Sequence, residues 1–241
     1  MRIIRTKNYE EMSVKAAGII SAQIALKPNS VLGLATGSTP LGIYENLIKA
    51  YCENGLDFSE VKTINLDEYK GISPENEQSY QYYMQNKLFN HINIKSENTH
   101  LPDGLANEAQ AECNRYDNVV KLCGGIDLQL LGIGHNGHIG FNEPSDCYNK
   151  HTHCVRLSER TIEANKRFFK EASDVPNHAY TLGICAIFKA KCILIAACGR
   201  DKAEIIKKTF SGPITPEVPA SILQIHNNVI LIGDEEALAL I

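Results

Sequence analysis

The sequence contains no apolar run that approaches the ~18 residues needed to span a membrane as a helix. Its opening, Met-Arg-Ile-Ile-Arg-Thr-Lys, lacks the apolar segment of a secretory signal peptide. Basic residues are not in excess, because 24 Lys and Arg stand against 28 Asp and Glu, for a net charge of −4. We therefore expect a cytoplasmic protein that binds neither membranes nor nucleic acids.

The eight cysteines lack the spacing of a redox or zinc motif, since none forms a Cys-x-x-Cys pair. Several lie in apolar runs such as residues 192–198, which favours free thiols in a reducing compartment over disulfides or zinc ligands. His135 and His138 are three residues apart, and residues 151–154 add two histidines and a cysteine, but no tetrahedral ligand set is complete. We expect no metal site.

Strand-like and helix-like segments alternate along the 241 residues, which are enough for one large core. Apolar runs predict strands at residues 30–35, 61–66, 126–131, 191–197 and 229–232. Helical periodicity predicts helices at residues 9–26, 40–53, 77–91 and 106–122, and from about residues 200 and 234. This alternation predicts one α/β domain, residues 1–241, with a mainly parallel open sheet flanked by helices. The polar stretch 146–177 is either a mobile lid or a solvated helix–loop excursion.

The most informative segment is residues 132–144, Gly-Ile-Gly-His-Asn-Gly-His-Ile-Gly-Phe-Asn-Glu-Pro, directly after a predicted strand. Glycines at the end of a strand let the backbone approach a ligand closely. His138, followed five residues later by Glu143, suits a general acid/base whose imidazole is oriented by a carboxylate. Because open α/β sheets bind ligands beyond the carboxyl ends of their strands, we expect the chemistry here.

A second segment, residues 34–40, Leu-Ala-Thr-Gly-Ser-Thr-Pro, joins a predicted strand to a helix with Pro40 at its first position. Free N–H groups at a helix N-terminus attract anions such as phosphate, and the hydroxyls of Ser38 and Thr39 add donors. The alternative is an ordinary helix N-cap. The segment is neither Walker A nor Gly-x-Gly-x-x-Gly, so neither ATP nor NAD is expected.

Charged side chains follow other predicted strands. Asp67 and Glu68 point to different faces, so one can act as a base in the ligand crevice while the other faces the structure. A solvated acidic loop is the alternative. Lys202 follows the strand at 191–197 and can reach an anion, and aromatic neighbours can anchor Arg167. The alternative for both Lys202 and Arg167 is an ordinary surface side chain.

Together these segments resemble the glucosamine-6-phosphate deaminase family, also named glucosamine/galactosamine-6-phosphate isomerases. Six matching segments occur in the family's order and approximate spacing: residues 34–40, 65–69, 132–144, 164–169, 199–202 and 219–226. The resemblance implies an α/β fold related to ribose-5-phosphate isomerase and 6-phosphogluconolactonase. It also implies isomerisation and deamination of glucosamine 6-phosphate with water to fructose 6-phosphate and ammonia, in amino-sugar catabolism and without a cofactor.

Residue roles follow from the resemblance in the same way. Asp67 is implied as the base that moves a proton between C2 and C1. His138 is implied to act on the ring oxygen during sugar opening, with Glu143 orienting it. The residues implied to bind the 6-phosphate are Thr36, Gly37, Ser38, Thr39, Arg167 and Lys202.

The chain departs from some family members at two places. Asn136 stands at a position where some members of the family have an acidic residue. Because asparagine has no carboxyl proton to exchange, we expect its side chain to form hydrogen bonds only. Hexameric members bind the activator N-acetylglucosamine 6-phosphate with basic residues after the catalytic turn and a longer C-terminal tail. Residues 151–156, His-Thr-His-Cys-Val-Arg, keep only part of that charge, and the chain ends at Ile241. We expect a monomer or small homo-oligomer without this activation.

Two other functions fit the same fold. A phosphogluconolactonase-like hydrolase has no need of Asp67 as a carbon base. A non-catalytic sugar-phosphate sensor usually carries an attached DNA-binding segment, whereas this chain begins at the enzyme-like domain and keeps Asp67, His138 and Glu143. The residues therefore favour the deaminase.

Overall fold

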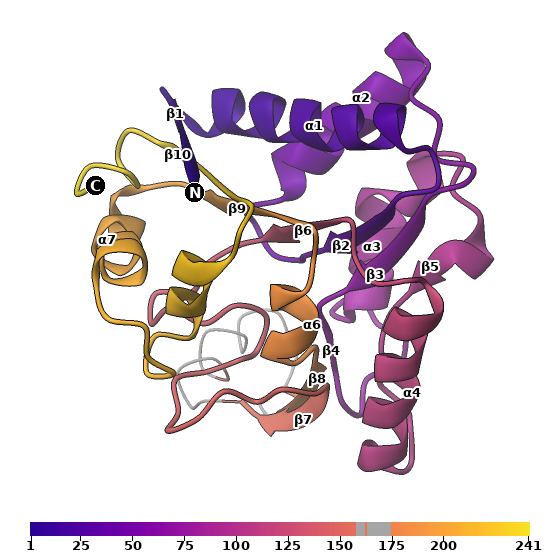
Figure 1. Ribbon diagram of the computed structural model, residues 1–241. Coiled ribbons are helices and arrows are strands. Elements are labelled where there is room, and N and C mark those ends of the chain that lie inside the picture. Colours follow the sequence, from indigo (N-terminus) through magenta and orange to yellow (C-terminus); the bar gives the residue numbers. More distant parts are fainter. Residues whose placement is uncertain (158–161, 163–174) are drawn as a thin grey trace.

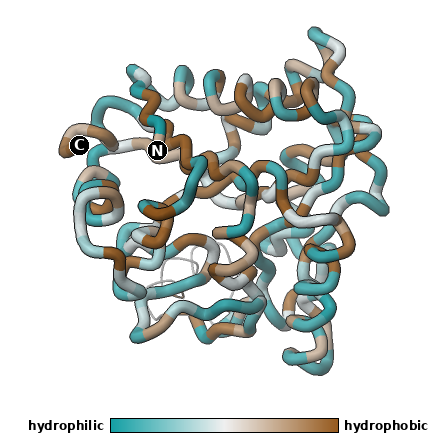
Figure 2. Tube along the Cα trace, in the orientation of Figure 1, coloured by the Kyte–Doolittle hydropathy of each residue, from teal (hydrophilic) through white to brown (hydrophobic). Residues whose placement is uncertain are grey.

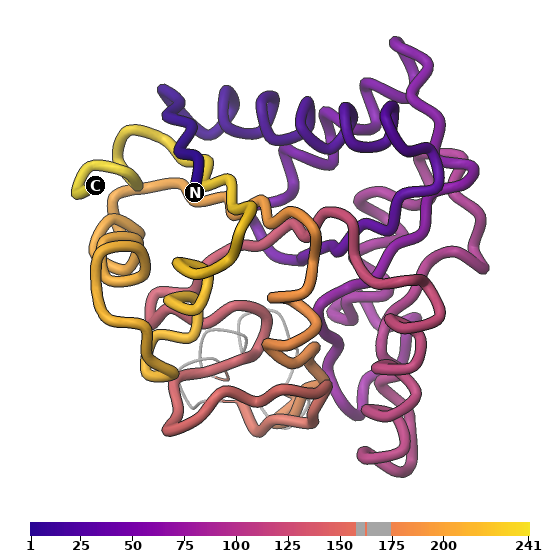
Figure 3. Tube along the Cα trace, viewed as in Figure 1, coloured from indigo at the N-terminus to yellow at the C-terminus, as the bar shows by residue number. Residues whose placement is uncertain are grey.

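The computed structural model describes residues 1–157, 162 and 175–241 (Figure 1). In these ranges, one sheet has the strand order β1-β10-β9-β6-β2-β3-β5, and every neighbouring pair is parallel. The pairing of β1 with β10 brings the first and last strands of the chain side by side (Figure 3). The strands are β1 (Arg2–Thr6), β2 (Val31–Leu34), β3 (Lys62–Asn65), β5 (Thr99–His100), β6 (Leu128–Leu131), β9 (Cys192–Ala197) and β10 (Val229–Asp234).

Helices cover both faces of this sheet (Figure 1). In β9, Ile193 and Ile195 belong to one buried cluster, and Leu194 and Ala196 belong to the other. Successive strand residues face opposite sides, so a continuous apolar strand needs a cover on each side. Figure 2 shows the hydrophobic colouring of the central strands. One cluster includes α1 (Tyr9–Leu26), α2 (Leu41–Asn54) and α3 (Tyr80–Lys87), and the other includes α4 (Ala109–Leu122), α6 (Ile184–Phe188) and α7 (Ala203–Ser211).

A second, smaller sheet lies below the main one in Figure 1. It consists of β4 (Asp67–Tyr69), β8 (His178–Thr181) and β7 (His153–Arg156), paired antiparallel in that order. Only Leu66 separates β3 from β4, so the chain passes directly from the main sheet into the small one. Asp67, paired with Thr181, is thereby held at the junction of the two sheets.

The predicted fold class is confirmed, and so are most elements of the main sheet. The five predicted strands are β2, β3, β6, β9 and β10, and the helices predicted at 9–26, 40–53 and 106–122 are α1, α2 and α4. The helix predicted at 77–91 is shorter, because the Ser79 hydroxyl accepts the Tyr82 N–H and caps a helix that begins at Tyr80. A short 3-10 turn, η1 (Phe89–His91), follows it, and another, η4 (Arg200–Lys202), precedes α7.

The helix predicted from residue 234 is wrong, because residues 235–240 form turns. The Asp234 carboxylate accepts the N–H groups of Gly199 and Ala237, and it thereby links the loop after β9 to the turns after β10. Sequence analysis also missed β1, β5 and the whole small sheet. Two further 3-10 turns, η2 (Ser96–Asn98) and η5 (Pro219–Ile225), complete the elements described.

Nothing among the described helices is both long and apolar enough to cross a membrane. The stretch interpreted as a lid or an excursion, residues 146–177, is described only at 146–157, 162 and 175–177, and it includes β7. The rest of that stretch, with Arg167, lies outside the described residues.

Candidate active site

Four adjacent strands of the main sheet end around one cavity of about 280 Å³. Residues 36–39 follow β2, Asp67 follows β3, the turn from Gly132 follows β6, and Lys202 lies beyond β9. Because β9, β6, β2 and β3 are neighbours, segments distant in sequence meet at one carboxyl edge of the sheet. The structure therefore brings together four segments that sequence analysis proposed separately.

Asp67 and Glu68 are both buried, with exposed fractions of 6% and 2%, but their surroundings differ as predicted. Glu68 accepts three backbone N–H bonds at 2.8–3.0 Å, two of them from the first turn of α3. Asp67 lines the cavity, and none of the described residues offsets its burial with a hydrogen bond. Burial, with a smaller contribution from the Glu68 charge, raises the pKa of Asp67 to about 8. A carboxylate of this pKa suits a general base.

His138, Glu143 and Asn136 form one connected group beside the cavity. Nδ1 of His138 lies 3.4 Å from Oε1 of Glu143. Nδ2 of Asn136 donates to Oε2 of Glu143 at 2.6 Å, and Oδ1 of Asn136 accepts the His138 N–H at 3.2 Å. A carboxylate beside Nδ1 favours the tautomer protonated there, which leaves Nε2 to exchange a proton. The Asn136 amide can hold this geometry, which is the hydrogen-bonding role expected of it.

Two glycines in the turn at residues 132–144 are required by the close approach of neighbouring atoms. A Cβ on Gly134 would lie 2.2–2.4 Å from three atoms of the His138 imidazole. Gly140 has a φ of +58°, and a Cβ there would lie 2.8 Å from Oγ1 of Thr181 and 3.4 Å from Oδ2 of Asp67. The absence of side chains at these positions lets the turn lie against both the histidine and the carboxylate.

The loop at residues 36–39 leads into α2, but its hydroxyls do not cap the helix. Pro40 occupies the N-cap, one residue earlier than the first helical position predicted for it, and makes no side-chain capping bond. Ser38 and Thr39 line the cavity instead. Gly37 has a φ of +98°, a left-handed conformation that other residues rarely adopt. The ordinary N-cap interpretation is therefore wrong for these two hydroxyls, and the loop borders the cavity beside a helix N-terminus.

Lys202 lies opposite this loop in a short chain of polar contacts. Its Nζ is 3.4 Å from Nδ1 of His135, and Nε2 of His135 is 2.5 Å from Oδ2 of Asp201. An ammonium group only donates, so Nδ1 accepts from it, and the imidazole proton then points to the carboxylate. His135 pairs with Asp201 rather than with His138. In the described part of the chain, no three His, Cys, Asp or Glu side chains converge as metal ligands.

Sequence analysis missed Tyr80, which lines the cavity. Its ring packs against Tyr69 and Phe141 at centroid distances of 4.8 and 6.1 Å. Burial raises the pKa of the Tyr80 hydroxyl well above its usual value, so the group stays protonated. The signal that could have placed it is Ser79, a favourable N-cap that puts Tyr80 first in α3.

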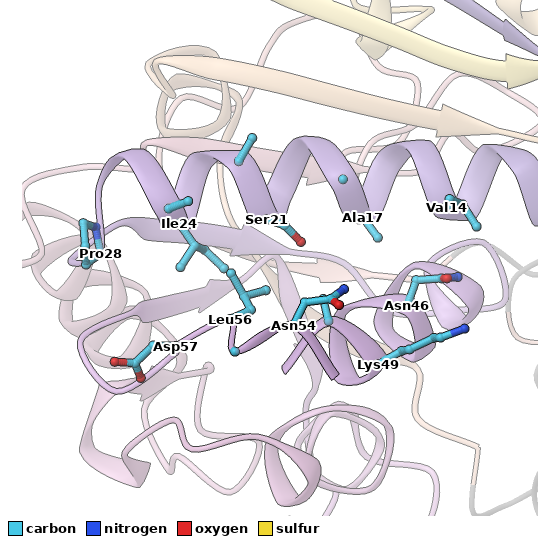
Figure 4. A pocket seen from close by; sticks show the side chains of 15 residues that line it. Val14, Ala17, Ser21, Ile24, Pro28, Asn46, Lys49, Asn54, Leu56 and Asp57 are labelled. Carbon is cyan, nitrogen blue, oxygen red and sulfur yellow. The ribbon is translucent and has the colours of Figure 1, made fainter. Parts of the chain in front are cut away.

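A larger cavity, of about 800 Å³, lies between α1 and α2, away from these groups (Figure 4). Its α1 wall is made of small and apolar side chains such as Ala17 and Ile24, and α2 contributes Asn46 and Lys49. It brings together no acid/base pair, since Asp57 is the one carboxylate among its described lining residues. The smaller cavity at the sheet edge is therefore the candidate active site.

The fold and this cavity define the class: an α/β enzyme whose cavity at the sheet edge is lined by a glycine–hydroxyl loop, a buried carboxylate and a histidine beside a carboxylate. The sequence matches the family "Glucosamine-6-phosphate isomerases/6-phosphogluconolactonase" over residues 6–232, and the chain belongs to this family.

Individual relatives agree with this placement. A glucosamine-6-phosphate deaminase from Lachnoclostridium phytofermentans is 58% identical over 232 residues, covering 96% of this chain and 98% of the relative. A protein of the same name from a Thermoanaerobacter species is 56% identical, covering 100% of this chain and 95% of its own.

Solved structures show the same fold. One, described as a monomeric glucosamine-6-phosphate deaminase, is 44% identical, with a TM-score of 0.96 and full coverage of both chains. The 6-phosphogluconolactonase from Leishmania guyanensis is 24% identical, with a TM-score of 0.78 over 98% of this chain and 97% of its own. The second likeness concerns the fold alone.

Proposed function

We propose that this protein converts glucosamine 6-phosphate and water to fructose 6-phosphate and ammonia. The observation that carries the proposal is the buried Asp67 carboxylate, which faces the same small cavity as the loop 36–39 and His138. The reaction requires a base near carbon, a separate acid/base near the ring oxygen, and an anion site at a distance. The names of relatives at 52–58% identity support the same activity.

The phosphate is bound at the loop end of the cavity. Backbone N–H groups of residues 36–39 and the α2 N-terminus provide donors for the dianion. Lys202, half-buried beside the loop, adds a charge-assisted hydrogen bond. Arg167 is proposed as a second cation on the strength of the family resemblance alone. With the phosphate fixed, the reacting carbons are held at the other end, beside Asp67.

Ring opening precedes the isomerisation. In the proposed step, Nε2 of His138 takes the proton of the C1 hydroxyl and gives it to the ring oxygen as the C1–O5 bond breaks. Glu143 beside Nδ1 stabilises the positive charge that develops on the imidazole. Asn136 holds Glu143 in place by its 2.6 Å hydrogen bond.

Asp67 then acts as the acid/base at two neighbouring carbons. Its carboxylate takes the proton from C2, which gives an enolamine. The carboxyl proton exchanges with water, and Asp67 then delivers a proton to C1. The imine left at C2 is hydrolysed by water, and ammonia leaves as the ketone of fructose 6-phosphate forms. All of these steps are proton transfers and addition of water, which the carboxylate and imidazole groups can carry out.

We further propose that the protein is a cytoplasmic monomer or small homo-oligomer without allosteric activation. A 44% identical structure is described as monomeric, and all eight cysteines are free thiols. In the stretch compared with the activator site, His151 and Thr152 already bond to Asp117 of α4 at 2.5–3.1 Å. Light scattering should show a small assembly, and rates should be hyperbolic and indifferent to N-acetylglucosamine 6-phosphate. Sigmoid curves that this sugar makes hyperbolic would contradict the proposal.

The activity is tested by incubating the purified protein with glucosamine 6-phosphate. Ammonia and fructose 6-phosphate should form in equal amounts, and Asp67→Asn should abolish both. The same protein is assayed on 6-phosphogluconolactone, whose hydrolysis requires no base at carbon. Lactone hydrolysis without ammonia release, or sugar-phosphate binding without turnover, would overturn the proposal.

A further inference from the structure

Two tyrosine hydroxyls bond to carbonyl groups in residues 35–39, which include the loop that borders the cavity. Oη of Tyr44 donates to the carbonyl oxygen of Ala35 at 2.6 Å, and Oη of Tyr83 donates to that of Gly37 at 2.7 Å. Tyr44 comes from α2 and Tyr83 from α3, so two helices contact the same short loop.

Tyr9, on α1, contacts the next two carbonyl groups. Its Oη lies 3.0 Å from the carbonyl oxygen of Ser38 and 3.1 Å from that of Thr39. The same oxygen accepts the N–H of Gly42 at 2.8 Å, which ties it to the first turn of α2. The hydroxyls of three tyrosines, from three helices, therefore lie within hydrogen-bond distance of four carbonyl groups in residues 35–39, and the Tyr9 proton is shared between two of them.

Because the peptide bonds are planar, the bonds to these carbonyl groups also fix the direction of the N–H groups that follow them. In a trans peptide, the carbonyl of one residue and the N–H of the next point in opposite directions, and the described residues contain no cis peptide. A hydroxyl on the carbonyls of residues 35, 37 and 38 therefore directs the N–H groups of Thr36, Ser38 and Thr39 away from the tyrosines. Those three residues line the cavity, whereas none of the three tyrosines is among its described lining residues. Within the described chain, these N–H groups donate to no protein acceptor.

We propose that Tyr9, Tyr44 and Tyr83 are positioning residues that set the affinity for the 6-phosphate. By holding the carbonyl groups, they fix three N–H donors toward the cavity before the anion arrives. Donors that are already oriented bind an anion without the entropy cost of ordering the loop. This inference rests on the proposed function, which supplies a phosphate as the group bound at the loop.

Two further features support this role. The loop includes Gly37, which has no Cβ to restrict its backbone and adopts a φ of +98°, so contacts from other residues must hold the orientation of its peptide. Burial raises the pKa of the Tyr83 hydroxyl above its usual value, so it remains a donor at every working pH. The contact with the Gly37 carbonyl therefore persists across the range in which the enzyme would be assayed.

The test compares Tyr83→Phe with Tyr82→Phe, its neighbour on α3. The hydroxyl of Tyr82 makes no hydrogen bond to the described residues, so its loss controls for a phenylalanine in this helix. Tyr83→Phe should raise KM for glucosamine 6-phosphate about 3–10-fold, the loss of one ordinary hydrogen bond, with kcat within about twofold. Tyr82→Phe should change neither. A fall in kcat at unchanged KM in Tyr83→Phe would overturn the role.

Calorimetry with inorganic phosphate separates this inference from the reaction. Tyr83→Phe and Tyr9→Phe should each raise the Kd of inorganic phosphate by the same factor as KM, and activity on unphosphorylated glucosamine should not change. If the wild-type protein releases no ammonia, the proposed function fails, but phosphate binding still decides the inference. A Kd unchanged in both variants, or no phosphate binding by the wild-type protein, would overturn it.

Discussion

The two ends of the cavity hold charge in opposite ways. At the loop end, backbone N–H groups and the half-buried Lys202 border the space in which we propose that the phosphate of the substrate binds. At the other end, the protein buries its own anion, because Asp67 is 6% exposed and no hydrogen bond from the described residues offsets that burial. Hydrogen-bond donors stabilise a charged phosphate. The absence of such donors around Asp67 raises the pKa of its carboxylate, which makes it basic enough for the proposed removal of a proton from carbon.

Glu68 makes the comparison sharper because it is the next residue in the same strand. It is equally buried, but three backbone N–H groups bond to its carboxylate and tie β4 to the start of α3. Its role is therefore structural, although burial also raises its pKa, to about 7. Of two adjacent carboxylates, the one without donors faces the cavity, and a raised pKa alone does not identify the base.

The largest expected effect comes from removing the base. Asp67→Asn keeps the size of the side chain but cannot accept the proton from C2, so kcat should fall about 10²–10⁴-fold or more. Substrate binding should stay within several-fold, because the role is confined to the transition state. Steady-state kinetics and equilibrium binding measure the two effects, and a near-normal kcat would remove Asp67 from the role of base.

The next effect concerns the loop end. Lys202→Ala should raise KM for glucosamine 6-phosphate about ten- to a hundredfold, because a hydrogen bond to a charged group contributes roughly 1.5–3 kcal/mol. Arg167→Ala is expected to act in the same direction. Free glucosamine is the matched control, and it should be affected little. Equal losses for both sugars would mean that these cations do not recognise phosphate.

A smaller effect is expected from the support of His138. Glu143→Gln removes the charge beside Nδ1 and should lower kcat about tenfold through slower ring opening. Substrate analogues rich in the open-chain form should partly restore this variant but should not restore Asp67→Asn. If the open-chain analogues restore both variants equally, or neither, then ring opening does not depend on Glu143 separately from the proton transfer at carbon by Asp67.

The smallest effect is on stability. Burial raises the pKa of Asp67 to about 8 in the folded state, whereas its pKa in the unfolded chain is about 4. The folded protein therefore has its full stability below pH ~4, where Asp67 is protonated in both states, and loses the contribution of the protonated carboxyl as pH rises through 8. Asp67→Asn cannot ionise, so at pH 8–9 its Tm should exceed that of the wild-type protein by at least roughly 2 °C. The gain should shrink toward zero near pH 4. A difference independent of pH would show that ionisation of Asp67 is not its cause.

Sequence patterns predicted the parts of this structure that have strong local signals. Apolar strands buried on both faces, such as β9, and the periodicity of α1 set the main sheet and its cover. Glycine-rich and charged segments after those strands then fall at one edge, because parallel strands share a direction.

The small sheet was missed because its signals are not local. β4, β7 and β8 have three or four residues each and include polar side chains such as His178 and Thr181, and their pairing depends on segments far apart in the chain. The three tyrosines that bind the loop were missed for the same reason. An aromatic residue on a helix gives no sign of which distant carbonyl its hydroxyl reaches.

In the proposed reaction Asp67 takes a proton from C2 and delivers a proton to C1, while the loop end of the cavity only binds. The most direct test runs the reaction in deuterated water and examines C1 of the fructose 6-phosphate formed. The account predicts solvent deuterium at C1 with the wild-type protein and with Lys202→Ala at saturating substrate, and none with Asp67→Asn beyond its residual turnover. Two results would contradict this role of Asp67: deuterium at C1 formed by Asp67→Asn at the wild-type rate, or no solvent deuterium at C1 in the product of the wild-type protein.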